Sequence, residues 1–178
     1  MRRVAVLVPY YTNELNVFEE ISLHRLHNVL SKYTIIYIKP SCLHIESPYE
    51  HSEVSFDDSF FSSIKSYNRL LLSEEFYRFF LNYEYILICQ LDVLVVSDRM
   101  EEFCDLGYDY YGAPWLYGMP IRIGNRCKIR FVGNGGFSLR KVDKTISLLR
   151  ENKESLKKYH GNEDMFFAYY ASPAYRVC

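Results

Sequence analysis

The sequence lacks any pair of cysteines at the Cys-x-x-Cys spacing, and its five cysteines are widely separated. Such a set indicates neither a disulfide framework nor a zinc site, and it is typical of a reducing compartment. The five histidines show no metal-ligand spacing. No Gly-x-Ser-x-Gly element is present, so a serine-hydrolase mechanism has no support. We therefore expect a cytoplasmic protein.

Long hydrophobic runs and a strong excess of one charge are also missing. No apolar run reaches membrane-spanning length, and the run after Arg3 is too short for a signal-peptide core. With 21 basic and 22 acidic residues the formal net charge is −1, which gives no electrostatic reason to bind nucleic acid. We expect no transmembrane segment and no nucleic-acid partner, and the sequence carries no signal for an oligomeric state.

Aromatic residues are abundant, with 17 tyrosines and 12 phenylalanines. We expect most of them to pack in a core and some to line a groove for flat ligands such as bases and sugars. A chain of 178 residues is long enough for one domain with a sizeable core. We therefore treat residues 1–178 as a single domain.

Apolar runs and helical periodicity alternate along the chain. Residues 4–8 and 33–38 are rich in β-branched residues and predict strands. Between them we expect a helix capped by Thr12 or Asn13, with an apolar face formed by Leu15, Phe18, Ile21, Leu26 and Val29. Two strands joined by a helix pair in parallel by default, with a right-handed crossover.

The same patterns predict the remaining elements. Strands are expected at 86–96, 137–139 and 174–178, and loops at 41–58 and 112–133. Helices are expected at 60–80 in two pieces broken near Leu72-Ser73, at 99–106 closed by Gly107, after residue 142, and at 162–170. A loop as long as 112–133 is more often functional than idle. The alternation predicts an α/β domain with a mostly parallel central sheet flanked by helices.

The run from Ile86 to Val96 is almost wholly apolar, with Gln90 and Asp92 in its middle. A buried Asp is costly unless it is paired. Ligands of open α/β sheets bind beyond the carboxyl ends of the strands, and Mg²⁺ or Mn²⁺ prefers carboxylate oxygens. Asp92 is therefore a candidate metal ligand. The alternative is that Asp92 caps a turn through backbone N–H groups.

The segment Asn162-Glu163-Asp164 places two carboxylates at the start of a helix. The helix dipole alone favours this arrangement, with Asn162 as the N-cap. The functional alternative is that one carboxylate is a general base facing the strand ends.

A glycine-rich segment runs from Gly133 to Arg140 and suits a sharp turn or a close approach of backbone to ligand. It precedes a strand and lacks the spacing of a phosphate loop. Arg140 and Lys141 either pair with phosphate or face solvent. Trp115, the only tryptophan, is either a platform for a sugar ring or a buried anchor for its loop.

Taken in order, these elements resemble a GT-A-type glycosyltransferase. More closely, the chain is similar to a family of largely uncharacterised bacterial GT-A-like domains of surface-polysaccharide synthesis. The matching stretches are residues 6–11, 64–70, 85–98, 107–115, 132–141 and 162–167. They span nearly the whole chain, so the resemblance implies a single GT-A-like, Rossmann-like domain.

The resemblance also assigns residues. Gln90-Leu91-Asp92 matches the Asp-x-Asp element, so the metal ligand is Asp92, while Gln90 can only hydrogen-bond, for example to the ribose. The other donor-binding matches are Pro9, Tyr10, Tyr11, Lys65, Asn68 and Arg69. The sugar or acceptor would contact Trp115, Asn134, Gly135 and Gly136. Glu163 and Asp164 match the catalytic Glu-Asp pair of inverting members, in which the Asp is the base.

The implied reaction moves a sugar from a nucleotide-diphosphate-sugar donor to a hydroxyl of a glycan acceptor, with inversion and with Mn²⁺ or Mg²⁺. A lipid-linked acceptor would place the protein at the inner face of the membrane. Family members often carry a later His ligand that is absent here, which leaves three alternatives: the chain is truncated after Cys178, it binds metal weakly, or it needs no metal. The alternative is a non-catalytic nucleotide-sugar or glycan-binding module. A glycosidase would need two carboxylates flanking one bond, which no pattern indicates.

Overall fold

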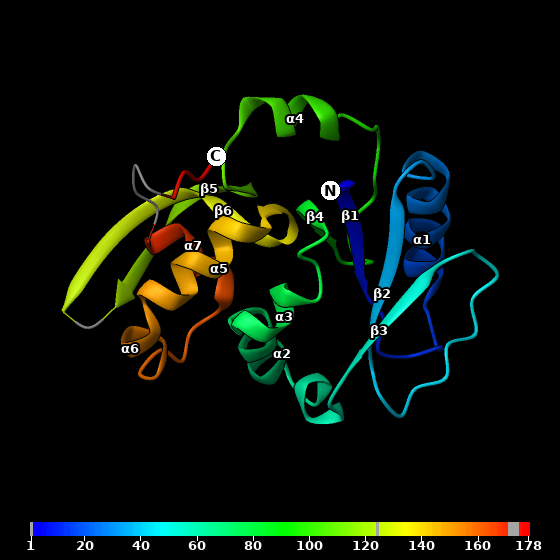
Figure 1. Cartoon of the computed structure of the whole chain (residues 1–178), viewed down its shortest axis with the longest axis horizontal. Coiled ribbons are helices and arrows are strands. Elements are labelled where there is room, and N and C mark those ends of the chain that lie inside the picture. The colour runs from blue at the N-terminus through cyan, green and yellow to red at the C-terminus, as the bar shows by residue number, and fades with distance from the viewer. Residues whose placement is uncertain (1, 124, 171–174) are drawn as a thin grey trace.

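The computed structural model describes residues 2–123, 125–170 and 175–178, which form a six-stranded mixed sheet of order β3-β2-β1-β4-β6-β5 (Figure 1). The first four strands of that order run parallel. Strand β6 is antiparallel to both β4 and β5. The strands are β1 Arg2–Pro9, β2 Thr34–Pro40, β3 Ser52–Phe56, β4 Tyr83–Cys89, β5 Tyr110–Ile123 and β6 Arg126–Lys141. The predicted α/β class with a mostly parallel sheet is confirmed.

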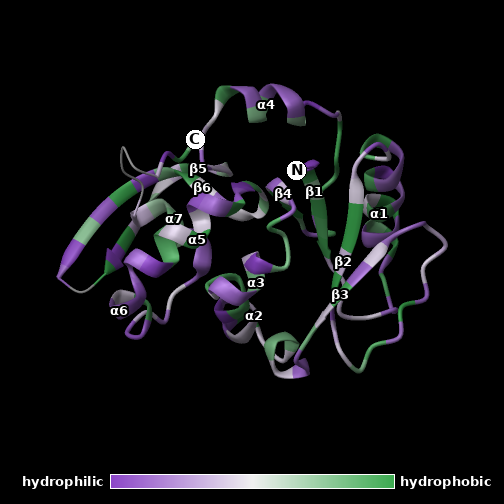
Figure 2. Ribbon diagram, viewed as in Figure 1, coloured by the Kyte–Doolittle hydropathy of each residue, from purple (hydrophilic) through white to green (hydrophobic). Residues whose placement is uncertain are grey.

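Helices cover both faces of this sheet, because successive strand residues point to opposite sides. One face packs Ala5 and Leu7 against α2, α3, α5 and α7. The other packs Val4, Val6 and Val8 against α1 and α4, and β1 is hydrophobic along most of its length (Figure 2). The helices are α1 Val17–Val29, η1 Asp58–Phe61, α2 Ile64–Leu71, α3 Glu74–Arg78, α4 Met100–Leu106, α5 Val142–Glu151, α6 Lys153–Leu156 and α7 Glu163–Tyr169.

The predicted start of the first helix is wrong, and its predicted apolar face is confirmed in part: Leu26 is buried and Leu15 and Val29 pack against the core, whereas Phe18 and Ile21 are exposed. Asn16, rather than Thr12 or Asn13, caps α1, in a capping box with Glu19. The buried residues of α1 are Ser22, Leu23 and Leu26. Phe18 is 81% exposed, although the sequence pattern assigned it to the core.

Two predicted loops contain strands. The loop at 41–58 includes β3, whose polar edge-strand sequence hides the pairing with β2 from Ile36↔Ser52 to Pro40↔Phe56. The loop at 112–133 is instead most of a hairpin formed by β5 and β6. Gly112, Pro114 and Gly118 lie where the pairing is irregular, with register shifts between Gly112 and Met119. The predicted strand at 137–139 lies within β6.

A close approach of backbones divides this hairpin. A Cβ on Gly112 would lie 2.6 Å from the carbonyl carbon of Gly133, and Gly133 has φ +144°. The Tyr110 hydroxyl donates a 2.8 Å hydrogen bond to the Gly133 carbonyl at the same level. This Gly112–Gly133 contact separates an inner part of the hairpin, next to β4, from an outer part.

Other boundaries agree better with the sequence. The helix predicted at 60–80 is broken as expected, and Ser73 caps α3 through a 3.2 Å hydrogen bond from the Phe76 N–H. Gly107 closes α4 at φ 68°. Strand β4 ends at Cys89, earlier than predicted. Of the predicted closing strand, Ala174 lies outside the described residues, and the rest makes an isolated bridge from Val177 to Tyr110.

Within the described part of the chain, no helix combines the length and the apolar character needed to cross a membrane.

Candidate functional site

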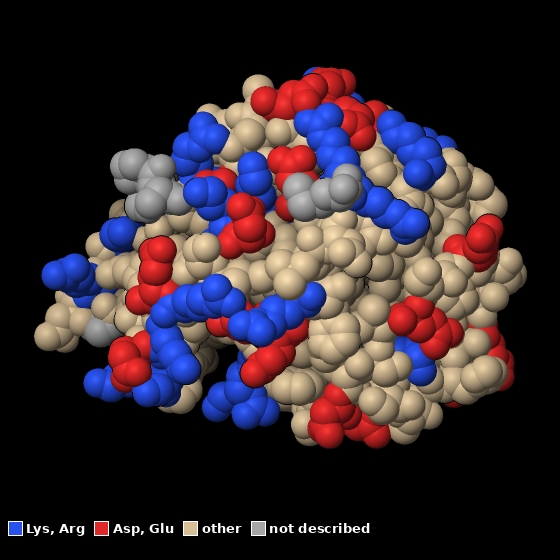
Figure 3. All heavy atoms as spheres, in the orientation of Figure 1, with Lys and Arg blue, Asp and Glu red and all other residues tan. Residues whose placement is uncertain are grey.

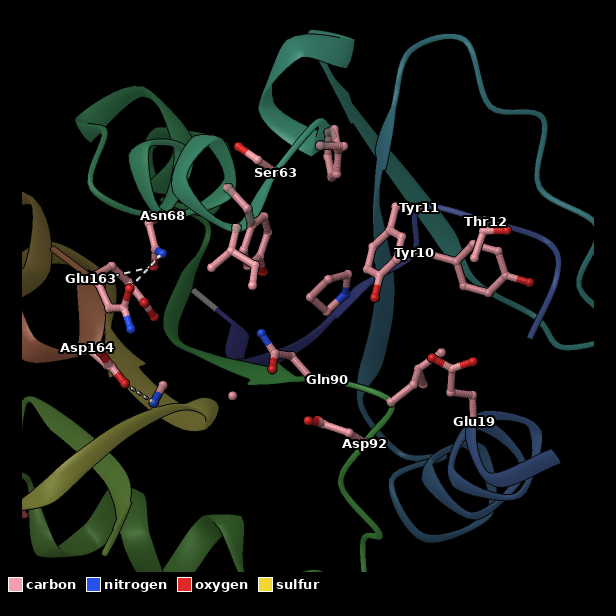
Figure 4. A pocket seen from close by; sticks show the side chains of 18 of the residues that line it. Tyr10, Tyr11, Thr12, Glu19, Ser63, Asn68, Gln90, Asp92, Glu163 and Asp164 are labelled. Carbon is pink, nitrogen blue, oxygen red and sulfur yellow. Dashed lines mark hydrogen bonds between the residues drawn. The ribbon is translucent and has the colours of Figure 1, made fainter. Parts of the chain in front are cut away.

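A cavity of about 500 Å³ opens at the carboxyl ends of β1 and β4 (Figure 4). Its walls come from the loop after β1, the start of α2, the turn after β4, the inner part of β6 and the start of α7. The sequence-predicted site residues that line it are Pro9, Tyr10, Tyr11, Asn68, Gln90, Leu91, Asp92, Asn134, Gly135, Gly136, Glu163 and Asp164. The fold therefore brings residues from distant parts of the chain to one space.

Lys65 and Arg69 do not line this cavity, because they lie on a different face of α2. Residues Ile64, Tyr67 and Asn68 share the helical face that the cavity touches. Lys65 follows Ile64 and Arg69 follows Asn68, so both lie further round the helix, and both are exposed. Helical spacing from Asn68 could have found Ile64 and Tyr67, which the sequence reasoning missed. The other missed lining residues are Thr12, Leu15, Glu19, Phe61, Ser63 and Asn162.

Trp115 does not line the cavity either. It is half-buried and packs beside Ile121, Ala168 and Tyr169, between the hairpin and α7. A Cβ on Gly133 would lie 3.0 Å from its ring. This packing matches the alternative in which Trp115 anchors its segment.

The Asp92 carboxylate is exposed and accepts no hydrogen bond from any residue in the described ranges. The expected burial of Asp92 is wrong, because β4 ends at Cys89 and the chain leaves the sheet before residue 92. The turn is closed instead by the Val93 N–H, which donates 3.2 Å to the Gln90 carbonyl. The Asp92 carboxylate is therefore open to the cavity and does not cap this turn.

Gln90 and Gly136 lie side by side across β4 and β6. The Gln90 N–H donates 2.9 Å to the Gly136 carbonyl, and a Cβ on Gly136 would lie 2.7 Å from Gln90 Oε1. The Asn134 side chain accepts a 3.1 Å hydrogen bond from the Gly136 N–H. Glycine at 136 therefore leaves the space that the Gln90 amide occupies.

Arg140 is fully buried and forms an ion pair of 2.6 Å with Glu163. Its guanidinium also donates to the Tyr77 hydroxyl at 2.9 Å and to Ser138 Oγ at 3.0 Å. The rings of Tyr110 and Phe167 lie within 5.2 Å and 5.1 Å of it. Arg140 therefore neither faces solvent nor reaches a phosphate in the cavity. Lys141 lies 3.4 Å from Glu84.

Glu163 is thereby held in one position at the start of α7. Its N–H donates a 3.0 Å hydrogen bond to Asn68 Oδ1, which joins α7 to α2. Asn162 occupies the N-cap position without a side-chain cap hydrogen bond. Its Oδ1 instead accepts a 3.4 Å hydrogen bond from Asn68.

Asp164 lies beside this pair and faces the glycine segment (Figure 4). One carboxylate oxygen accepts a 2.6 Å hydrogen bond from the Met165 N–H, and the other a 3.4 Å bond from the Gly135 N–H. Burial, and secondarily the charge of Glu163, raises the pKa of Asp164 to about 6. A carboxylate with such a pKa is suited to accept a proton near neutral pH.

We predict that Gly135→Ala destabilises the protein by about 1–3 kcal/mol, the usual range for overpacking. The new Cβ would lie 2.3 Å from Glu163 Oε1, and the ion pair with Arg140 prevents Glu163 from moving away. The measurement is urea unfolding. Gly136→Ala is the matched control, since its Cβ meets the mobile end of Gln90. Equal losses in the two variants would contradict this account.

Solved structures share this fold. A crystal structure of an active-site mutant of LgtC matches with a TM-score of 0.65 at 13% identity, over 98% of this chain and 72% of that chain. Core-mannan synthase A from Aspergillus fumigatus, in a Mn/GDP form, matches with a TM-score of 0.60 at 11% identity, over 98% and 68%.

A nucleotidyltransferase-like enzyme is similar too. The 4-diphosphocytidyl-2C-methyl-D-erythritol synthase from Anaerococcus prevotii matches with a TM-score of 0.56 at 12% identity, over 99% of this chain and 86% of that chain. These likenesses establish a GT-A-like fold for this chain. No curated protein sequence matches it. The model of a family described as a protein of unknown function, DUF5672, matches residues 51–177, and the chain belongs to that family.

Proposed function

We propose that this protein is a glycosyltransferase that moves a sugar from a nucleotide-diphosphate-sugar donor to a hydroxyl of a glycan acceptor in bacterial surface-polysaccharide synthesis. The observation that carries this proposal is the cavity that Asp92 and Asp164 both line. The two carboxylates differ in environment, since Asp92 is exposed and Asp164 is half-buried with a raised pKa. Such a difference suits two roles in one reaction.

The donor nucleotide would occupy the end of the cavity after β1. Tyr10 is buried and stacked on Tyr37 with ring centroids 4.9 Å apart, so it forms a rigid wall. Tyr11 is 60% exposed and points into the cavity (Figure 4), where its ring offers a face for a nucleobase. The Gln90 amide lies further in and can hydrogen-bond a ribose hydroxyl.

The donor atoms at Asp92 fit a divalent ion that binds together with the nucleotide. Within the described residues, no group of three or more His, Cys, Asp or Glu side chains could hold a metal by itself. Mg²⁺ commonly takes one or two carboxylates from the protein and completes its shell with phosphates and water. Asp92 would hold Mg²⁺ or Mn²⁺ in this way, and the ion would stabilise the charge of the departing diphosphate.

Asp164 would be the general base. Its carboxylate takes the proton of the acceptor hydroxyl while that oxygen attacks the anomeric carbon. The bond from this carbon to the diphosphate oxygen breaks, and the diphosphate leaves with the electron pair. We propose attack opposite the leaving group, which inverts the anomeric centre. Glu163 is occupied by Arg140, so its proposed part is to position Asp164 and raise its pKa.

A second candidate is a non-catalytic module that binds a nucleotide-sugar or a glycan. The uncharged Gln90 favours it, because that position carries no second carboxylate for a metal. The buried pair beside Asp164 favours the enzyme, since a binding module has no use for a carboxylate with a raised pKa. A turnover assay with a bound donor separates the two.

The test of the proposed function is a thermal-shift screen of UDP-, GDP-, CDP- and dTDP-sugars with and without Mn²⁺, followed by a transfer assay on the best donor. A donor present at 100 times its dissociation constant stabilises the folded state by about 2.7 kcal/mol. We expect one nucleotide class to raise the melting temperature more strongly with Mn²⁺. A screen in which no nucleotide-sugar stabilises the protein would exclude the glycosyltransferase and a nucleotide-sugar-binding module, and would leave a glycan-binding module.

We predict that Asp92→Ala weakens Mn²⁺-dependent donor binding at least about tenfold, because the cation loses its protein carboxylate. The measurement is calorimetry with the donor identified in the screen, with and without Mn²⁺. Glu151→Ala removes an exposed carboxylate at the end of α5 and is the matched control. Unchanged donor affinity in the Asp92 variant would remove its role in metal binding.

A further inference from the structure

The outer part of the β5–β6 hairpin exposes large apolar side chains. Leu116 is 84% exposed, Tyr117 97%, Ile129 63% and Phe131 61%. Ile129 and Phe131 lie beside Gly118, since a Cβ there would lie 2.9 Å from the Phe131 ring and 3.1 Å from Ile129, and Leu116 and Tyr117 directly precede Gly118 in the chain. Contiguous exposed apolar surface of this kind marks an interaction site more often than an ordinary surface.

The geometry of the hairpin explains why these side chains have no partner in the chain. Between the pairs Pro114↔Val132 and Met119↔Arg130, β5 contains residues 115–118 and β6 contains only Phe131. Residues 115–118 therefore form a bulge in β5. In β6 the alternation turns Lys128 and Arg130 toward α7, where they donate to the Tyr169 and Ala168 carbonyls at 2.8 Å and 2.9 Å. Ile129 and Phe131 therefore lie on the opposite, outer face.

The hairpin is also free of negative charge. None of the 22 acidic residues of the chain lies between Asp109 and Asp143. Arg122 pairs with Cys127 and therefore shares the outer face with Ile129 and Phe131, whereas Arg126 lies opposite Ile123 beside the turn; both arginines are exposed. The tip at the left of Figure 3 carries basic and uncharged surface. A protein with nearly balanced charge thus presents one surface that combines cations with apolar groups.

We propose that this surface, formed by Leu116, Tyr117, Ile129, Phe131 and Arg122, with Arg126 beside the turn at its edge, docks the protein on an anionic lipid bilayer. Exposed Leu, Tyr and Phe side chains can enter the region between headgroups and acyl chains, and a tyrosine suits that boundary with its polar tip. Arginines beside them are attracted to anionic headgroups. The surface lacks carboxylates, which such headgroups would repel.

The position of this surface relative to the cavity suits a substrate held in a membrane. Strand β6 continues from Ile129 and Phe131 to Asn134, Gly135 and Gly136, which line the cavity. A bilayer against the outer hairpin would therefore lie beside the cavity rather than behind the sheet. Docking itself depends only on the hairpin, so it can be tested whether or not the protein transfers sugar.

The test is co-sedimentation of the full chain with vesicles of phosphatidylcholine alone and of phosphatidylcholine with 30% phosphatidylglycerol, at two salt concentrations. We expect binding to the anionic vesicles that weakens at high salt, because surface charge is screened there. Leu116→Ser with Tyr117→Ser should weaken binding at least about tenfold. Arg122→Gln with Arg126→Gln should weaken it about fivefold for each cation removed.

Val17→Ser with Phe18→Ser is the matched control, since these residues of α1 are 67% and 81% exposed at the other end of the molecule. It should bind vesicles like the wild type. No binding to anionic vesicles, or equal loss in this control, would overturn the proposal. So would a dimer in light scattering that Leu116→Ser with Tyr117→Ser dissociates without any vesicle binding, because the surface would then be an interface between copies.

Discussion

Asp164→Asn is expected to reduce the rate of sugar transfer by about 10²–10⁴-fold, the usual contribution of a general base. The asparagine keeps the size of the side chain and still accepts a hydrogen bond, but it cannot take a proton from the acceptor hydroxyl. Donor binding should change little, because Asp92 and Tyr11 are untouched. The measurement is the initial rate of transfer with the donor found by the screen. A variant that transfers at nearly the wild-type rate would show that Asp164 is not the base.

The pH dependence of the wild type should agree with this role. Asp164 acts only when deprotonated, and its pKa is about 6. Therefore kcat/KM should rise with pH and level off above about pH 6–7. In Asp164→Asn the residual rate should lack this rise.

The same pKa predicts that the inactive variant is the more stable protein. The pKa of Asp164 is about 6 in the folded state, whereas an aspartate in the unfolded chain has a pKa of 3.8. The folded state binds more protons between these values, so the free energy of unfolding falls as pH rises from about 4 to about 6. Above this range Asp164→Asn should exceed the wild type by about 1–3 kcal/mol, and near pH 3.5 the difference should vanish. Loss of activity would then not come from unfolding.

Arg140→Met is expected to lower the free energy of unfolding by about 3–5 kcal/mol, because it leaves the buried Glu163 carboxylate without its cation. The hydroxyls of Tyr77 and Ser138 would also lose the hydrogen bonds that Arg140 donates to them. Urea unfolding measures the loss. A cost below about 1 kcal/mol would mean that water or a rearranged side chain replaces Arg140.

A double variant, Arg140→Met with Glu163→Leu, separates the ion pair from the fold around it. Replacing a whole buried pair by apolar side chains is often neutral or stabilising, so most of the stability should return. The pKa of Asp164 should fall when the charge of Glu163 is removed, because that charge raises it more than Arg140 lowers it. The pH midpoint of transfer should therefore shift downward, a change that a purely structural role of the pair would not produce.

Local patterns in the sequence were enough to predict much of the fold. A continuous apolar run produced β1, Ser73 and Gly107 marked helix ends, and Asp92 lay beyond a strand at the edge where α/β proteins bind ligands. Each of these signals depends on a few neighbouring residues. The position of the cavity could be predicted because the ends of the strands and the glycine segment are recognisable in the sequence, and both line it.

The errors came from features that depend on residues far apart. Arg140 follows a glycine turn, and nothing nearby indicates that its partner is Glu163. The hairpin contains the glycines and prolines of a loop, and only its pairing with β4 and α7 makes it a strand pair. For α1, the packing against the sheet decides which face is buried, and Phe18 lies on the exposed side.

The contact of Gly112 with Gly133 has a consequence for how this protein can change over time. The two backbones touch where only hydrogen fits between them, so the crossing point is fixed. Insertions or deletions near the turn would change the exposed surface of the outer hairpin, yet they would leave Asn134 and Gly135 in place in the wall of the cavity. The outer part of the hairpin can therefore vary in sequence and length, while the Gly112–Gly133 contact keeps its inner part in place at the cavity.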